Sequence, residues 1–144
     1  MKVAVVIKAK GSRVATTRPE LTIGTVAHRL TMENVGALVV SNDDKTVLGM
    51  ISESDIVHGL AEHGAALLDM RVDELMGLGI PSCTPEESIN QVMARMTRER
   101  MRYLPVVEHG KLCGVISIGD VVKHRLDEIQ LEAAVLRDTA GKPD

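Results

Sequence analysis

Apolar residues recur along one side of a predicted helix in two separate stretches of this chain. Both stretches follow the spacing i, i+3, i+4, i+7, which is typical of an amphipathic helix. Their apolar positions are Ile23, Val26, Ala27 and Leu30 in the first stretch, and Ile89, Val92, Met93 and Met96 in the second. Thr22 and Ser88 directly precede the two stripes, and Ser88 with Gln91 forms a capping-box pattern. We therefore predict one helix that begins after Thr22 and another that begins after Ser88.

Short apolar runs on both sides of each helix predict strands. One run precedes each helix, and two follow it, joined by a turn. The predicted strands are 14–16, 37–41 and 47–52 in the first half, and 80–83, 104–107 and 112–117 in the second. A closing helix begins at the Ser-x-x-Asp that follows the last strand of each half. Each half is then a β-α-β-β-α unit of the α+β class, in which helices cover one face of a small sheet.

The two halves also repeat in sequence, about 66 residues apart. Residues 49–57 return as 114–122, with five identical positions in nine. Two copies of about 60 residues indicate a duplicated unit and not the long array of a solenoid. We predict a first repeat at 1–66 that includes a lead-in helix, a second repeat at 67–128 and a helical extension at 129–144. One half alone would be only marginally stable, so the halves are expected to share a core.

Composition and charge narrow the class of protein. Hydrophobic residues make up 44% of the chain and charged residues 26%, which is ordinary for a soluble globular protein. The net charge is −3 and no basic run stands out, so nucleic acid is not an expected partner. No stretch approaches the roughly 18 apolar residues of a membrane span, and the apolar run at 3–7 is interpreted as structure, not as a signal peptide. Cys83 and Cys113 have no metal-ligand spacing, and we expect two reduced thiols in the cytoplasm.

The last predicted helix is longer than its counterpart in the first half. It extends from Asp120 to about Thr139 and ends before Gly141 and Pro143. Its apolar residues are spaced 4, 3, 4, 3, which is an a/d seam: Val122, Leu126, Ile129, Ala133 and Leu136. Two interpretations are open. The seam packs on the core of its own chain, or it is the contact of a homodimer.

The repeated Gly-x-x-Ser-x-x-Asp, at 49–55 and 114–120, is a candidate binding motif. It lies at a strand-to-helix junction, where unpaired backbone N–H groups suit a phosphate. An Asp one turn into the helix can accept two hydrogen bonds from a ribose diol. Gly49 and Gly114 would leave room for a flat base. The alternative is that each Ser and Asp simply form a capping box.

Together these features resemble a tandem pair of cystathionine-β-synthase (CBS) domains, the Bateman module, over residues from about 3 to 128. The resemblance rests on the repeated motif, the lead-in helices, the Thr/Ser-x-x-Pro segments and the Leu-Pro-Val-Val strand at 104–107. It implies two β-α-β-β-α repeats packed sheet to sheet about a pseudo-twofold axis, with two clefts between them. In that family the clefts bind adenosine-containing ligands: AMP, ADP, ATP, S-adenosylmethionine or NAD.

The resemblance also implies which residues form the site. Asp55 and Asp120 would bind ribose, and Ser52, Ser54 and Ser117 would contact phosphate or ribose. The remaining implied residues lie near the first strands or around adenine and phosphate: Thr16, Ala37, Leu38, Ser82, Arg102, Tyr103, Leu104 and Pro105.

The two copies differ at positions that matter for binding. The second copy has Arg102 and Tyr103 where the first has Gly36 and Ala37. Arg102 can pair with a phosphate bidentately, and Tyr103 can stack on adenine. Ser54 stands where many stand-alone relatives carry Arg. We therefore expect two unequal sites.

These observations favour a regulatory module that senses an adenine nucleotide, forms a homodimer and acts on a downstream partner that the sequence does not identify. Catalysis is not expected, because the chain has no Gly-x-Ser-x-Gly, Walker loop, Rossmann turn or zinc motif. No metal or required cofactor is expected beyond the adenosine-containing ligand. The alternative is a ligand-free interaction module that works through its last helix.

Overall fold

The computed structural model describes residues 1–11 and 14–140, with the side chain of residue 140 excepted. The last four residues of the predicted extension therefore lie outside the described residues. The elements, in chain order, are α1 (Val3–Lys10), β1 (Thr16–Thr17), α2 (Ile23–Glu33), β2 (Ala37–Val40), β3 (Gly49–Ser52), α3 (Glu53–His63), η1 (Gly64–Asp69), α4 (Val72–Leu75), α5 (Ile89–Arg98), β4 (Tyr103–Glu108), β5 (Lys111–Ser117) and α6 (Ile118–Ala140).

Local sequence signals account for where the helices begin. The Thr22 side chain accepts a hydrogen bond from Thr25 N at the start of α2. Ser88 and Gln91 form the predicted capping box at the start of α5. Each helix buries three of its four predicted apolar positions, and the fourth, Ala27 or Met93, is half-buried, so these two predictions are confirmed.

The strands form two small sheets. In the first sheet β1 pairs in parallel with β2, and β2 pairs antiparallel with β3. In the second sheet β4 pairs antiparallel with β5. The predicted strand at 80–83 is wrong, because the structure has only an isolated parallel bridge between Cys83 and Val106. Pro81 lies in this segment and lacks the N–H that a continuous ladder would use.

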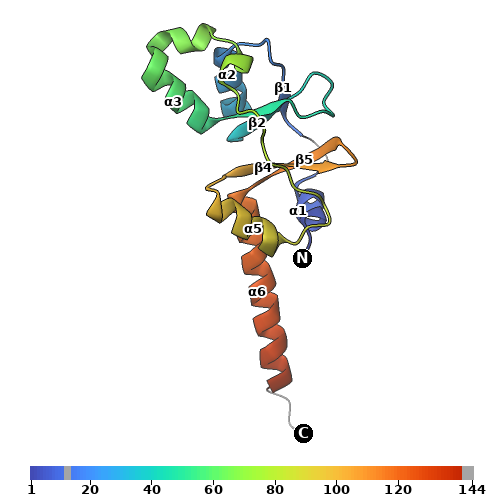
Figure 1. Cartoon of the computed structure of the whole chain (residues 1–144). Helices are drawn as coiled ribbons and strands as arrows, with labels where there is room; N and C mark the ends of the chain where they lie inside the picture. The colour runs from blue at the N-terminus through green and yellow to red at the C-terminus, as the bar shows by residue number, and fades with distance from the viewer. Residues whose placement is uncertain (12–13, 141–144) are drawn as a thin grey trace.

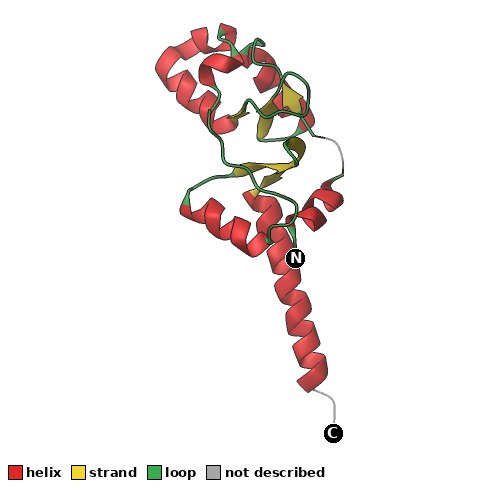
Figure 2. Cartoon of the chain, turned by 45° about the vertical axis from the view of Figure 1, so that its right-hand side comes forward, coloured by secondary structure: helices red, strands yellow, loops and turns green. Residues whose placement is uncertain are grey.

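The two sheets pack against each other, and the helices cover their outer faces (Figures 1 and 2). Successive strand residues point to opposite faces. Leu38 and Val40 therefore pack under the helices of the first repeat, and Leu104 packs under those of the second. Ala37 and Val39 face the other sheet, where they join a cluster shared by both repeats. The expected common core is therefore present.

The lead-in helices are exchanged between the repeats. Val3 and Val6 of α1 are fully buried in the core of the second repeat. Leu67 and Val72, which follow the first repeat, are fully buried in the core of the first. The spatial units are therefore not continuous in sequence. The boundary between residues 66 and 67 stays a prediction about the duplicated unit.

The helix α6 projects away from the body of the molecule (Figure 1). The N-terminal ammonium of Met1 contacts Glu128 Oε2 at 2.7 Å. The apolar seam does not pack on the core of its own chain: Leu126 is 54% exposed and Leu136 is 69% exposed. Over the residues that the structure describes, no helix is both long enough and apolar enough to cross a membrane.

Candidate functional site

Two clefts lie between the repeats, and we name them after the carboxylates that the motif predicts for ribose. The Asp120 cleft has a volume of about 770 Å³ and the Asp55 cleft about 360 Å³. Both volumes are in the range of small-molecule sites. The two clefts share a wall formed by Ala37 of β2 and Tyr103 of β4.

Residues at equivalent positions of the two repeats line the two clefts. The segment after α2 lines the Asp120 cleft, and the segment after α5 lines the Asp55 cleft. The equivalent pairs are Asn34 and Arg100, Gly36 and Arg102, Ala37 and Tyr103, Ser117 and Ser52, and Asp120 and Asp55. The repeated sequence therefore produces two clefts that are lined by equivalent positions of the two repeats.

Each motif Asp forms the capping box that was the alternative to ribose binding. Ser52 N donates to Asp55 Oδ2 at 2.8 Å, and Ser117 N donates to Asp120 Oδ2 at 2.9 Å. The other oxygen, Oδ1, accepts no hydrogen bond from the described part of the chain in either case. Each Asp therefore caps its helix through one oxygen, and both residues line a cleft, so the two interpretations are compatible.

The space over the motif glycines is filled by the protein itself, and the prediction that these glycines make room for a base is wrong. A Cβ on Gly49 would lie 2.6 Å from the Gly77 carbonyl oxygen. A Cβ on Gly114 would lie 2.5 Å from Ile7 Cδ1. Both glycines instead allow the segments that were exchanged between the repeats to approach the strands closely.

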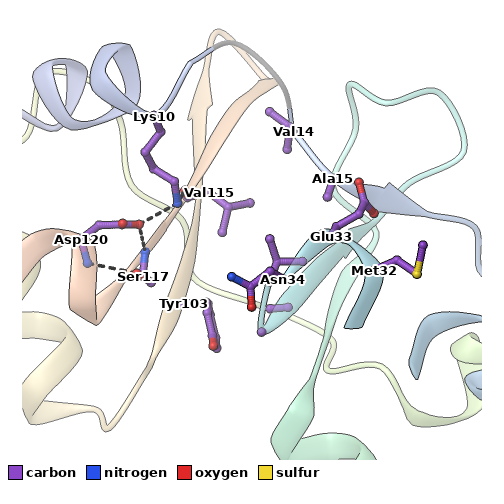
Figure 3. A pocket seen from close by; sticks show the side chains of 13 residues that line it. Lys10, Val14, Ala15, Met32, Glu33, Asn34, Tyr103, Val115, Ser117 and Asp120 are labelled. Carbon is purple, nitrogen blue, oxygen red and sulfur yellow. Dashed lines mark hydrogen bonds and ion pairs between the residues drawn. The ribbon is translucent and has the colours of Figure 1, made fainter. Parts of the chain in front are cut away.

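Lys10 is a residue of the Asp120 cleft that the sequence patterns did not predict. Its Nζ donates to Asp120 Oδ2 at 2.6 Å (Figure 3). It also donates to the Val115 carbonyl oxygen at 2.9 Å. Burial alone would raise the pKa of Asp120, but the hydrogen bonds from Lys10 and Ser117 outweigh it and hold this pKa below the ordinary value. The only signal in the sequence is the position of Lys10 at the end of α1, where the lead-in segment of the second repeat has Gly79.

Two arginines give the Asp55 cleft a different character. Arg102, which the sequence predicted, and Arg100, which it did not, both line this cleft. Neither guanidinium pairs with any carboxylate in the described part of the chain. Arg100 has a φ of 55°, a left-handed conformation that its equivalent Asn34 adopts more readily. The cleft therefore presents two unpaired cations, which suits an anionic ligand.

Tyr103 stands in the wall that separates the clefts. Its hydroxyl donates to Glu53 Oε1 at 3.4 Å, across the interface between the repeats. A Cβ on Gly36 would lie 1.8 Å from this hydroxyl oxygen, so the glycine permits the contact. Burial raises the pKa of Tyr103, and the nearby Glu53 carboxylate raises it further. The ring therefore borders both sites.

Some predicted residues lie away from the clefts. Leu38 and Leu104 are fully buried under the helices, and Pro105 is buried, with its carbonyl accepting from Cys83 N at 3.0 Å. None of these three side chains lines a cleft. A role for them in binding would need their backbone.

Thr16 and Ser82 also lie outside the residues that line the clefts. The Thr16 hydroxyl donates to Asp44 Oδ1 at 2.6 Å, and the Ser82 carbonyl accepts from Arg95 Nη2 at 2.9 Å. The remaining predicted residues are brought together as expected. In the Asp120 cleft these are Ala37, Tyr103, Ser117 and Asp120, and in the Asp55 cleft they are Ala37, Ser52, Ser54, Asp55, Arg102 and Tyr103.

This architecture, with its paired clefts, defines the class of protein. The CBS domain family matches residues 10–62 and 72–127, and the chain belongs to this family. A CBS-domain containing protein from Agrobacterium tumefaciens is 40% identical to it in sequence. Its crystal structure superposes with a TM-score of 0.83, over 87% of this chain and 99% of that one.

Two further relatives carry ligand names in their descriptions. The human 5′-AMP-activated protein kinase subunit gamma-3 is 34% identical over 96 residues, which are 62% of this chain. This chain covers only 20% of the length of that subunit. The CBS domain pair of protein MJ0100 was solved in complex with 5′-methylthioadenosine and S-adenosyl-L-methionine. That structure is 18% identical in sequence and superposes with a TM-score of 0.75, over 89% of this chain and 98% of that one. The similarity shows a shared fold.

Proposed function

We propose that this protein is a non-catalytic regulatory module that binds an adenosine-containing ligand in the clefts between its repeats. The observation that carries the proposal is the pair of equivalent clefts, each with a carboxylate oxygen that the helix cap leaves unused. Asp55 and Asp120 would accept the ribose hydroxyls. Ser52, Ser54 and Ser117 lie beside them and would contact ribose or phosphate.

The unpaired Arg100 and Arg102 favour a phosphate-bearing ligand in the Asp55 cleft. A planar guanidinium binds a phosphate through two parallel hydrogen bonds, and an unpaired one has no protein partner to give up. Among relatives, the name of one refers to activation by AMP and another was solved with adenosine derivatives. Binding would favour one arrangement of the repeats and so shift a population that a partner protein reads.

A panel of thermal shifts on nucleotide-stripped protein tests this proposal. The panel contains AMP, ADP, ATP, NAD, S-adenosylmethionine and GTP, and it is repeated with Asp55→Asn and Asp120→Asn. Asparagine can still accept the capping hydrogen bond, so these variants remove the charge and spare the cap. A ligand present at 100 times its Kd should stabilise the fold by about 2.7 kcal/mol. Selective stabilisation by one adenosine compound, lost in one variant, would support the proposal, and unchanged melting with every compound would refute it.

The exposed seam of α6 favours a second function, the assembly of a homodimer. Its apolar residues repeat at heptad spacing and are exposed in the single chain: Val122, Leu126, Ile129, Ala133 and Leu136. A second copy of the helix offers a surface of the same periodicity. Assembly through this seam is compatible with ligand binding, and it would be the main function if the clefts bind nothing.

A further inference from the structure

The two motif carboxylates differ in their charged neighbours. Asp120 is paired with Lys10, whereas Asp55 forms no ion pair with any residue that the structure describes. Lys2 and Arg71 form equivalent bridges to Ser88 and Thr22, so the two lead-in segments align at an offset of 69 residues. The position equivalent to Lys10 is then Gly79, which has no side chain to place beside Asp55. The cation beside the Asp120 carboxylate is therefore specific to one cleft.

This cation stands where a ribose would bind. Lys10 and Ser117 N both donate to Oδ2, so a diol that needs both carboxylate oxygens must displace the ammonium. The Lys10 and Asp120 side chains are 40% and 26% exposed, so a displaced ammonium regains water but loses its charge-assisted hydrogen bond to the carboxylate. A neutral ligand offers this ammonium no new partner, and the exchange is then unfavourable.

A phosphate on the ligand makes displacement of the Lys10 ammonium from Asp120 more favourable. The lysine side chain is a flexible stem that carries a point charge with three donors, so the ammonium can move from a carboxylate to a nearby phosphate. The Asp120 carboxylate would then be released to bind the ribose. One residue would couple recognition of the phosphate to recognition of the sugar.

We propose that Lys10 is the specificity-determining residue of the Asp120 cleft, and that it admits phosphorylated adenosine ligands and excludes unphosphorylated ones. The proposal rests on the adenosine-binding function proposed above. It assigns to the lead-in helix α1 a role in ligand choice within a cleft whose carboxylate belongs to the other half of the sequence.

Calorimetric titration with AMP and adenosine tests the proposal. All variants are made in an Asp55→Asn background, so that binding reports on the Asp120 cleft. The parent should bind AMP at least about tenfold more tightly than adenosine, the effect expected of one charge-assisted hydrogen bond. Lys10→Met, which removes the ammonium and keeps a long side chain, should weaken the binding of AMP and strengthen that of adenosine, so that this ratio falls to about one.

Three further variants control the experiment. Lys10→Arg keeps the cation and should keep the preference for AMP. Lys8→Met removes an exposed lysine of the same helix and should leave both affinities unchanged. Asp120→Asn should abolish binding of both probes, which places them in this cleft.

The outcomes separate this inference from the proposed function. If Lys10→Met binds both probes with the parent's ratio, the role of Lys10 is refuted and the binding function stands. If AMP binds the wild-type chain but not the Asp55→Asn parent, AMP binds in the Asp55 cleft. The role of Lys10 is then refuted, and the binding function stands. If AMP and adenosine bind neither protein, the role of Lys10 is refuted, and the binding function is refuted as well only if every other compound of the thermal-shift panel also leaves the melting unchanged.

Discussion

At the scale of single residues, Asp120 makes its structural contacts through only one of its two carboxylate oxygens. Its Oδ2 caps α6 and pairs with Lys10, while Oδ1 remains available to a ligand. A capping pattern in a sequence is therefore no evidence against a binding site, because a carboxylate has two oxygens and the cap uses one. The same reasoning applies to Asp55.

The lowered pKa of Asp120 predicts how its contribution to stability depends on pH. The folded pKa lies below the ordinary value of 3.8, so the ionised carboxylate stabilises the fold above about pH 4. That stabilisation is lost as the pH falls through the folded pKa. Asp120→Asn should therefore cost up to about 1 kcal/mol near pH 7, since the pair is partly exposed.

Urea unfolding of the wild type and of Asp120→Asn between pH 2 and pH 7 measures this effect. The difference in unfolding free energy should shrink steadily below about pH 4, where the wild-type carboxylate also becomes neutral. Lys10→Met should show a smaller difference with the same pH dependence. A difference that stays constant down to pH 2 would contradict the assignment to Asp120.

Two glycines provide a matched test of close backbone approach. Gly49→Ala should destabilise the fold by about 1–3 kcal/mol, because its Cβ would meet the Gly77 carbonyl oxygen and the backbone must shift. Gly119→Ala is the control. Its Cβ would meet only Ser117 Oγ, at 3.6 Å, so this change in the first turn of α6 should be neutral or stabilising. Equal melting temperatures for the two variants would contradict the packing role of Gly49.

At the scale of elements, the local signals predicted most of the helices and strands. Thr22 and Ser88 start their helices as predicted, because a cap and an apolar stripe both act within a few residues. The strand at 80–83 failed for an equally local reason, the proline at position 81. The sequence could not predict whether an apolar stripe on a helix is buried in the folded chain. The seam of α6 has the periodicity of a core helix, yet it is exposed, and periodicity does not say what covers it.

The exposed seam predicts the effect of charges on assembly. Leu126→Glu should convert a dimer into a monomer, because a buried charge in an a/d seam lacks a partner. Leu131→Glu is the control, since Leu131 is 66% exposed but lies outside the seam. Sedimentation or light scattering gives the mass, and circular dichroism shows whether the monomer remains folded. A Leu126→Glu variant with the mass of the wild type would exclude the seam as the contact.

At the scale of the whole molecule, the exchange of lead-in segments explains what sequence reasoning missed in the site. The repeat predicted Ser117 and Asp120, because the two copies share the motif. It did not predict Lys10, because this residue reaches the Asp120 cleft only when α1 crosses to the second repeat. Contacts between segments far apart in sequence depend on the topology, which local patterns do not record.

The exchange also makes the two repeats one cooperative unit. Val6 completes the core of the second repeat from the N-terminal end of the chain, and Val72 completes the core of the first. Both side chains are fully buried. Neither repeat can therefore unfold alone without exposing a segment that belongs to the other, and small domains built in this way unfold in a single transition.

Val6→Ala and Val72→Ala test this cooperativity. Each should lower the free energy of unfolding by about 2 kcal/mol, from lost burial and the cavity left behind. The midpoint in urea should fall while the m-value stays constant, and amide exchange should accelerate in both repeats for either variant. Val135→Ala, at an exposed position of α6, should change stability by less than about 0.5 kcal/mol. If Val6→Ala instead accelerates exchange in the second repeat alone, or splits the transition in two, the repeats are independent. Ligand binding in the clefts would then have to couple them.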